Sequence, residues 1–199
     1  MRSFLAFPLP TDALTYAAVL QRVFREEGVR GKWTRPETQH LTAQFLGDRT
    51  EDELTRLGDA IEAMNAPAPV LDCIGPGAFG KPPSVLTVAW DDPTRAYRNL
   101  VLSIRDAMRE TGIPCDPPEK QKKPVPHVTL LRIRDDRMKR LVRRLRRITP
   151  DGPAWPKNLL PPVPNTLQGL TFDSLVLFQS TLTPDGPVYD ALRTFPLGQ

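Results

Sequence analysis

Alternating and helical patterns of hydrophobic positions divide the chain into short strands and amphipathic helices. Residues 2–9 alternate and are rich in aromatic and aliphatic side chains, which predicts a strand. Apolar side chains then recur at helical spacing from Thr11 to about Glu27, and Gly28 is expected to end this helix. The same reasoning predicts strands at 40–46, 70–74, 85–90, 127–134 and 170–180, and helices at about 50–64, 93–111 and 136–148.

Glycine and proline mark the connections between these elements. Gly75-Pro76-Gly77 is expected to turn the chain after the strand at 70–74, and residues 184–187 are expected to form a turn in the C-terminal tail. The proline-rich residues 150–164 predict a surface connection, for which the sequence suggests no function. The helix at 136–148 has a strongly basic outer face, which we expect to be solvated; the alternative is that it guides an RNA backbone.

The predicted order is β-α-β-α-β-β-α-β-α-β, in which helices recur between strands. A strand, a helix, a strand containing His-x-Thr and a second helix occur in each half of the chain. This repetition predicts an α/β (α+β) fold. We expect residues 1–199 to form a single domain of two pseudo-symmetric lobes, each contributing one histidine strand.

Composition places the chain among soluble globular proteins. It has 199 residues, a formal net charge of +4 and a hydrophobic fraction of 40%. No apolar run approaches the roughly 20 residues that span a bilayer, and the short apolar stretch near Met1 does not resemble a secretory signal. With only Cys73 and Cys115, no disulfide framework is expected, which favours a cytoplasmic location with free thiols. We also expect no membrane association and a monomer. The modest positive charge suits an anionic ligand such as RNA.

The two histidines of the chain carry its most informative motif. His40 and His127 are each followed two positions later by a threonine, Thr42 and Thr129. Residues at i and i+2 lie on the same face of a strand, so each motif presents an imidazole beside a hydroxyl. Two such strands that face one pocket supply an acid, a base and two hydrogen-bond donors around one phosphate. The alternative is that histidine and strand-favouring threonine adjoin by chance.

Other ways of handling phosphate lack support in the sequence. Two histidines can ligate a metal, but no further ligands stand at a suitable spacing, and Asp91-Asp92 and Asp135-Asp136 are more simply turn or helix-cap residues. No glycine-rich phosphate loop of the Walker type occurs. We therefore expect neither a metal nor another cofactor.

Several segments together resemble the 2H phosphoesterases, and among them the RNA 2′,3′-cyclic phosphodiesterases of the ThpR/LigT group. The second histidine motif has the form Pro-His-x-Thr-Leu, and the resemblance covers nearly the whole chain. The similar segments are 2–7 with 9–10, 32–37 with 40–42 and 45–47, 126–130 with Arg132, and 180–184 with Gly186 and Tyr189.

The resemblance implies a bilobal fold in which two mainly antiparallel sheets with outer helices face each other across a central cleft. It implies metal-independent hydrolysis of an RNA terminal 2′,3′-cyclic phosphate to a 2′-phosphate, and some relatives also join RNA ends through a 2′-5′ linkage. It assigns His40 as the proton donor and His127 as the proton acceptor. Thr42 and Thr129 would donate hydrogen bonds to the non-bridging oxygens.

Two further residues are candidates for contact with substrate. Arg132 suits a phosphate clamp, but its position along the strand is out of phase with His127 and Thr129, so it reaches the cleft only if the strand ends or bulges there. Gln44 is in phase with His40, and we expect its amide to face the cleft. Relatives often carry a basic residue at this point, so Gln44 bears on substrate preference.

Two other functions remain open at this point. One is an RNA- or nucleotide-binding module that retains the cleft and does little chemistry. The other is a phosphodiesterase for a different substrate, such as ADP-ribose 1″,2″-cyclic phosphate or a 2′-5′-linked oligonucleotide. All three interpretations require the imidazoles of His40 and His127 to face one pocket.

Overall fold

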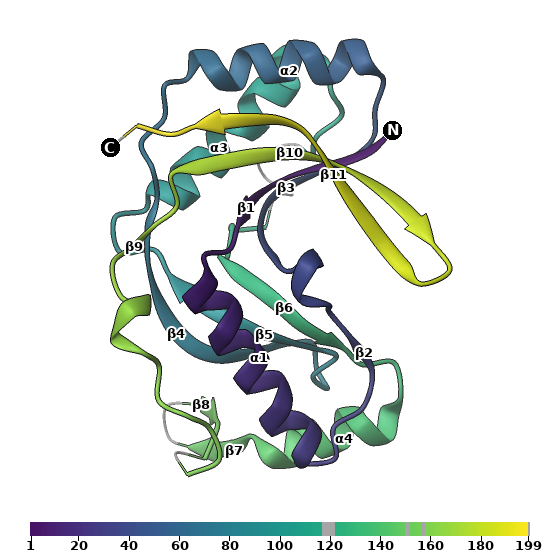
Figure 1. Ribbon diagram of the computed structural model, residues 1–199, viewed down its shortest axis with the longest axis vertical. Coiled ribbons are helices and arrows are strands. Elements are labelled where there is room, and N and C mark those ends of the chain that lie inside the picture. The colour runs from purple at the N-terminus through teal and green to yellow at the C-terminus, as the bar shows by residue number, and fades with distance from the viewer. Residues whose placement is uncertain (117–121, 150–151, 157, 199) are drawn as a thin grey trace.

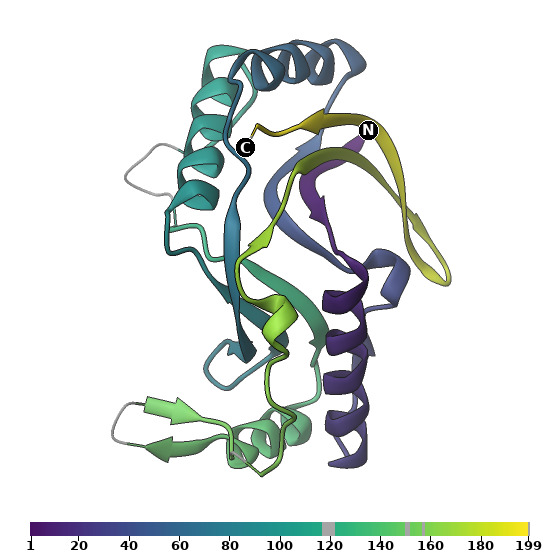
Figure 2. The ribbon, with the colours of Figure 1, turned by 60° about the vertical axis from the view of Figure 1, so that its left-hand side comes forward.

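A curled antiparallel sheet forms the centre of the protein. The computed structural model describes residues 1–116, 122–149, 152–156 and 158–198. Within these residues the main sheet has nine strands, in the order β11-β10-β1-β3-β6-β5-β4-β9, with β2 paired to β6. Figures 1 and 2 show how strongly this sheet curls and how the helices lie outside it. The predicted α+β fold is therefore confirmed.

The first half of the sheet contains the first histidine strand. It consists of β1 (Arg2–Pro8), β3 (His40–Asp48), β10 (Ser174–Thr183) and β11 (Gly186–Pro196). Strand β1 lies between β10 and β3 and pairs antiparallel with both. The β10–β11 hairpin extends well beyond its neighbours, as the yellow ribbon in Figure 1 shows.

The second half contains the second histidine strand. It consists of β2 (Lys32–Trp33), β4 (Val70–Phe79), β5 (Val85–Asp91), β6 (His127–Arg132) and β9 (Leu170–Thr171). Strand β6 pairs antiparallel with β5 on one side, and on the other side with the short β2.

The two halves meet between the histidine strands. Strands β3 and β6 are joined at one antiparallel pair, Leu41 with Val128, and both side chains are buried. These are the central residues of the two His-x-Thr motifs. The two sheets expected from the sequence are thus one sheet with a narrow junction at the motifs.

Four helices cover the sheet in the described part of the chain. Helix α2 (Glu51–Ala63) begins with a capping box made by Thr50 and Glu53, which satisfies two backbone amides at its start. The helices are α1 (Thr11–Glu26), α2, α3 (Ala96–Glu110) and α4 (Asp136–Leu145). Figure 1 shows α1 in the lower half of the molecule, beside β6, and α2 and α3 at the other end. None of these helices is long and apolar enough to cross a membrane.

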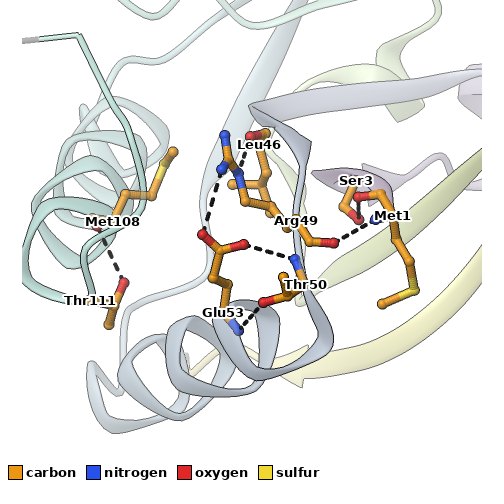
Figure 3. A network of polar contacts seen from close by, with 8 residues as sticks. All are labelled: Met1, Ser3, Leu46, Arg49, Thr50, Glu53, Met108 and Thr111. Atoms are coloured by element: carbon orange, nitrogen blue, oxygen red, sulfur yellow. Dashed lines mark hydrogen bonds and ion pairs between the residues drawn. The ribbon is translucent and has the colours of Figure 1, made fainter.

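A polar network fixes the far end of β3 against the N-terminus (Figure 3). The Arg49 amide donates to the Met1 carbonyl oxygen at 2.8 Å, and Arg49 Nε donates to the Leu46 carbonyl oxygen at 2.7 Å. The Arg49 guanidinium also lies 3.6 Å from a Glu53 carboxylate oxygen. The start of α2 is therefore tied to the strand that carries the first histidine.

Three predicted boundaries are wrong. Gly75-Pro76-Gly77 does not turn the chain: β4 runs through it, with a register shift between Cys73 and Gly75 and a positive φ of 106° at Gly75. Such a bulge uses glycine just as a turn does, so the sequence signal is the same. The strand predicted at 170–180 is divided into β9 and β10. Strand β11 was not predicted, because most of its residues are exposed on both faces and give no hydrophobic alternation.

The basic helix is shorter than expected. Helix α4 ends at Leu145, and β7 (Arg147–Thr149) pairs with β8 (Gly152–Ala154) as a separate small sheet. The predicted proline-rich connection therefore contains a strand. Residues 150, 151 and 157 of that connection lie outside the described residues.

A buried glutamine joins helix α1 to the second histidine strand. Gln21 Nε2 donates to the carbonyl oxygens of Thr34, at 2.8 Å, and Leu130, at 3.0 Å. Its side chain lies among apolar core residues and is only 7% exposed. Because Thr34 precedes the first histidine and Leu130 follows the second, Gln21 holds both segments in place.

We predict that Gln21→Met lowers the free energy of unfolding by about 1–3 kcal/mol, because two hydrogen bonds to backbone carbonyl oxygens are lost while the side-chain volume is kept. Chemical denaturation measures this change. Arg22→Met, at the exposed neighbouring position, is the control and is expected to change stability by less than about 0.5 kcal/mol. Equal denaturation midpoints for Gln21→Met and the parent chain would contradict the assigned role.

Candidate active site

One cleft contains both His-x-Thr motifs. It has a volume of about 600 Å³, and His40, Thr42, His127 and Thr129 all line it. Each motif places its first and third residues toward the cleft and its central residue, Leu41 or Val128, in the core. The expectation that the two imidazoles face one pocket is confirmed. We call this pocket the histidine cleft.

The junction between β3 and β6 sets how the four side chains face one another. The strands run antiparallel and are in register at Leu41 and Val128. This register directs His40 toward the Thr129 side and His127 toward the Thr42 side. Each imidazole therefore lies near the other motif's hydroxyl in a nearly two-fold arrangement.

Both imidazoles are anchored in the same way. His40 Nδ1 lies 2.8 Å from the Thr38 carbonyl oxygen, and His127 Nδ1 lies 2.8 Å from the Val125 carbonyl oxygen. A carbonyl oxygen only accepts hydrogen bonds, so Nδ1 carries the proton in each ring. In the neutral imidazole Nε2 is then the nitrogen free to accept a proton.

Aromatic rings support each imidazole. The ring centroids of Phe4 and His40 are 4.8 Å apart, and those of Phe79 and His127 are also 4.8 Å apart. Tyr189 makes an edge contact with His40 at 5.4 Å. These contacts, with the Nδ1 anchors, restrict rotation of both rings and hold Nε2 in a defined direction.

The electrostatic surroundings of His40 disfavour its charged form. Burial lowers the pKa of the His40 imidazole below its ordinary value, although the hydrogen bond to Thr38 opposes this change. The positive charges of His127 and Arg132 lower the pKa further. The cleft therefore has excess positive potential that an anion would relieve.

Arg132 reaches the cleft through a bulge in β6. Leu86 of β5 pairs with Leu131, but Thr87 pairs with Thr129, so Leu130 is an extra residue. Leu130 and Leu131 are both fully buried, and the alternation changes phase between them. Arg132 consequently lines the cleft with His127. The bulge that its predicted contact required is present.

Gln44 does not face the cleft, and this prediction is wrong. Leu5 pairs with Gln44 and Ala6 pairs with Thr42, so Ala43 is an extra residue that reverses the alternation of β3. Gln44 Oε1 instead accepts a hydrogen bond from Arg105 Nε of α3, at 2.8 Å. Phe45 takes the position toward the cleft and is 64% exposed.

The β10–β11 hairpin supplies a wall that the sequence alone did not identify. Arg35 donates a hydrogen bond to the Pro187 carbonyl oxygen at 3.0 Å, which ties the hairpin to the segment before His40. Residues 180–184, Gly186 and Tyr189 resemble a family signature in the sequence, but that resemblance did not indicate that they form part of the cleft. Basic side chains also line the cleft, namely Arg2, Lys32, Arg35, Arg132 and Arg134.

The acidic residues considered as metal ligands have structural roles. Asp92 accepts from the amides of Tyr97 and Arg98 at the start of α3, and Asp135 accepts from the amide of Arg137 at the start of α4. Among the described residues, no three His, Cys, Asp or Glu side chains gather where they could hold a metal ion. The two histidines therefore lack the additional protein ligands that a zinc site needs.

Comparisons with known proteins agree with this geometry. A family model described as LigT like Phosphoesterase matches residues 7–90. A protein from Aquifex aeolicus named RNA 2′,3′-cyclic phosphodiesterase is 30% identical over 189 residues, which cover 90% of each chain. A protein of the same name from Methanocaldococcus jannaschii is 25% identical over 200 residues, covering 97% of this chain and 99% of the relative.

The fold matches solved structures over the whole chain. The crystal structure of E. coli LigT in its apo form has a TM-score of 0.71 at 19% identity and covers 100% of this chain and 98% of its own. The protein TT0787 of Thermus thermophilus has a TM-score of 0.65 at 24% identity, with complete coverage of both chains. With the relative from Aquifex aeolicus, these likenesses show that the chain belongs to the LigT-like phosphoesterase family, within the 2H phosphoesterases.

Proposed function

We propose that this protein hydrolyses the 2′,3′-cyclic phosphate at the end of an RNA to a 2′-phosphate, without a metal ion. The observation that carries the proposal is the pair of identically anchored imidazoles lining one cleft. The names of the relatives from Aquifex aeolicus and Methanocaldococcus jannaschii support the same substrate. Nothing in this reaction requires an oxidant, a nucleotide cofactor or a covalent intermediate.

The two histidines divide the proton transfers. Water attacks phosphorus opposite O3′, and His127 Nε2 takes a proton from it. The P–O3′ bond breaks as the new P–O bond forms, and His40, in its imidazolium form, gives the Nε2 proton to O3′. The P–O2′ bond remains, so the product is a 2′-phosphate. In-line attack needs the base and the acid on opposite sides of phosphorus, and the nearly two-fold arrangement of the paired motifs suits this requirement.

Other residues of the cleft can stabilise the negative charge of the phosphate. Thr42 and Thr129 lie on the same face as the imidazoles, so their hydroxyls can donate to the non-bridging phosphate oxygens. Arg132 adds a charged, forked donor beside them. This charge grows on the phosphorane in the transition state, where the donors stabilise it more than in the ground state.

Substrate binding favours protonation of His40, the proposed proton donor. His40 must be protonated to act as the donor, yet burial and neighbouring positive charges lower its pKa. A bound phosphate brings a negative charge between His40 and Arg132, which favours the imidazolium. Phosphate binding therefore shifts His40 toward the protonated form that the proposed donor role requires.

The same chemistry permits 2′-5′ ligation. If the 5′-hydroxyl of a second RNA replaces water, His127 takes its proton and His40 again protonates O3′. The product then carries a 2′-5′ phosphodiester. An assay that contains a 5′-hydroxyl RNA tests this reaction beside hydrolysis.

We predict that His40→Ala and His127→Ala each lower kcat for uridine 2′,3′-cyclic phosphate by about 10²–10⁴-fold. Product analysis by phosphorus NMR should show a 2′-phosphate, and the parent chain should retain its activity in EDTA. Circular dichroism of each variant checks that the fold is unchanged. Full activity in either folded variant, or loss of the parent's activity in EDTA, would sink the mechanism.

A substrate with sulfur in place of O3′ separates the two roles. A thiolate leaves without being protonated, so the donor becomes dispensable while the base does not. We expect His40→Ala to recover most of the parent's rate on this substrate and His127→Ala to remain slow. Rescue of His127→Ala instead would reverse the assignment of donor and acceptor.

Removal of the Arg132 charge should change the pH profile. The Arg132 charge lowers the pKa of His40, so Arg132→Gln raises that pKa. The limb of the kcat/KM profile that His40 sets should therefore move to higher pH, and kcat/KM itself should fall because a phosphate donor is lost. Arg143→Gln, on the exposed face of α4, is the charge-matched control and should leave the profile in place. A shift to lower pH in Arg132→Gln contradicts this electrostatic account.

A further inference from the structure

A second groove adjoins the histidine cleft. It has a volume of about 550 Å³ and shares Lys32, Arg132 and Arg134 with the cleft. Arg30 and Arg137 extend it away from the cleft, and neither of them lines the cleft itself. We call it the basic groove, defined by Arg30, Lys32, Arg132, Arg134, Asp135 and Arg137.

The charge of the basic groove is strongly positive. Its five basic side chains are all exposed, and none forms an ion pair within the described part of the chain. Its single acidic residue, Asp135, uses its carboxylate to cap α4, accepting from the amides of Arg137, at 2.6 Å, and Met138, at 3.1 Å. Cationic side chains therefore outnumber the one carboxylate of the groove five to one.

Close backbone packing builds the groove. Strand β2 pairs with the end of β6 at Lys32 and Arg132. A Cβ atom added at Gly31 would lie 2.6 Å from the Arg132 carbonyl oxygen, so only glycine permits this approach. The chain then leaves β6, passes Arg134 and begins α4 directly. Cations from two separate stretches of the chain, 30–32 and 132–137, therefore line one groove beside the cleft.

We propose that the basic groove binds the RNA phosphodiester backbone on the 5′ side of the terminal nucleotide. This inference rests on the proposed function. A 2′,3′-cyclic phosphate ends the strand, so an RNA held in the histidine cleft continues only in the 5′ direction. Arg132 and Arg134 belong to both cavities, so the groove is the charged continuation of the cleft. Exposed arginines without an acidic partner bind phosphates without reading the base sequence.

The wall of the cleft formed by the β10–β11 hairpin lacks this character. The β10–β11 hairpin presents exposed apolar side chains there, with Leu182 at 68% and Val188 at 43% exposure. A phosphate backbone gains nothing from such a surface. The difference in charge therefore favours the path past Arg30 and Arg137.

The test compares a mononucleotide with a hexanucleotide that ends in the same 2′,3′-cyclic phosphate. We expect the hexanucleotide to have the lower KM in the parent chain. Arg30→Gln and Arg137→Gln should each raise that KM about threefold to tenfold, and so lower the ratio of hexanucleotide to mononucleotide kcat/KM. Each variant should also reduce the slope of log KM against log salt by about 0.7, as for one lost contact to a single strand.

Arg143→Gln provides the matched control. Arg143 lies on the same helix as Arg137, is exposed, and lines neither cavity, so its replacement should leave both substrates unaffected. An effect of Arg143→Gln equal to that of Arg137→Gln would indicate general attraction by a basic surface and overturn the inference. A hexanucleotide KM no lower than that of the mononucleotide would do the same.

Binding separates this inference from the proposed function. Fluorescence anisotropy of a labelled hexanucleotide with a 3′-phosphate reports on the groove whether or not turnover occurs. If the parent chain hydrolyses neither cyclic phosphate yet Arg30→Gln and Arg137→Gln weaken binding, the proposed function fails and the groove stands. If hydrolysis is normal and neither variant weakens binding, the groove fails and the proposed function stands.

Discussion

The pairing of Leu41 with Val128 is the constraint on which the site depends. It is the place where β3 and β6 are in register, and it joins the two halves of the sheet at the centres of the two motifs. Burial of both apolar side chains fixes this register, because a slip of one residue in either strand would turn its apolar side chain toward the cleft and its imidazole into the core. The energy that positions the histidines therefore comes from the hydrophobic core behind them, and Gln21 supports the same strands with hydrogen bonds from α1.

The positive charge of the cleft determines how readily His40 is protonated. The cleft collects arginines around an imidazole whose charged form is already disfavoured by burial. In such a site the imidazolium is disfavoured, and the negative charge of a bound phosphate favours it again. Arg132 and Arg134 line both the cleft and the basic groove, so in the proposed account the same charges hold the reacting phosphate and the strand that leads to it. Hydrogen bonds from both Nδ1 atoms to backbone carbonyl oxygens fix the orientation of the imidazoles on which these charges act.

The sequence predicted the periodic parts of this structure and failed where the period breaks. The helices and both histidine strands follow from local patterns, and so does the shared face of His40 and Thr42. Bulges are harder to predict. One extra residue moves the side chains that follow it to the opposite face of the strand, and the amino-acid pattern does not reveal this. Ala43 turns Gln44 away from the cleft, whereas Leu130 turns Arg132 into it. The exposed strand β11 lacked a hydrophobic face to reveal it, although it forms a wall of the site.

The most direct test of the central claim is a crystal structure with uridine vanadate, in which a five-coordinate vanadium mimics the transition state of in-line attack. The account predicts that the vanadium lies between the two motifs, with the Nε2 atoms of His40 and His127 bonded to the two apical oxygens and the hydroxyls of Thr42 and Thr129 bonded to equatorial ones. A vanadium bound elsewhere, or one contacted by a single histidine, would contradict it.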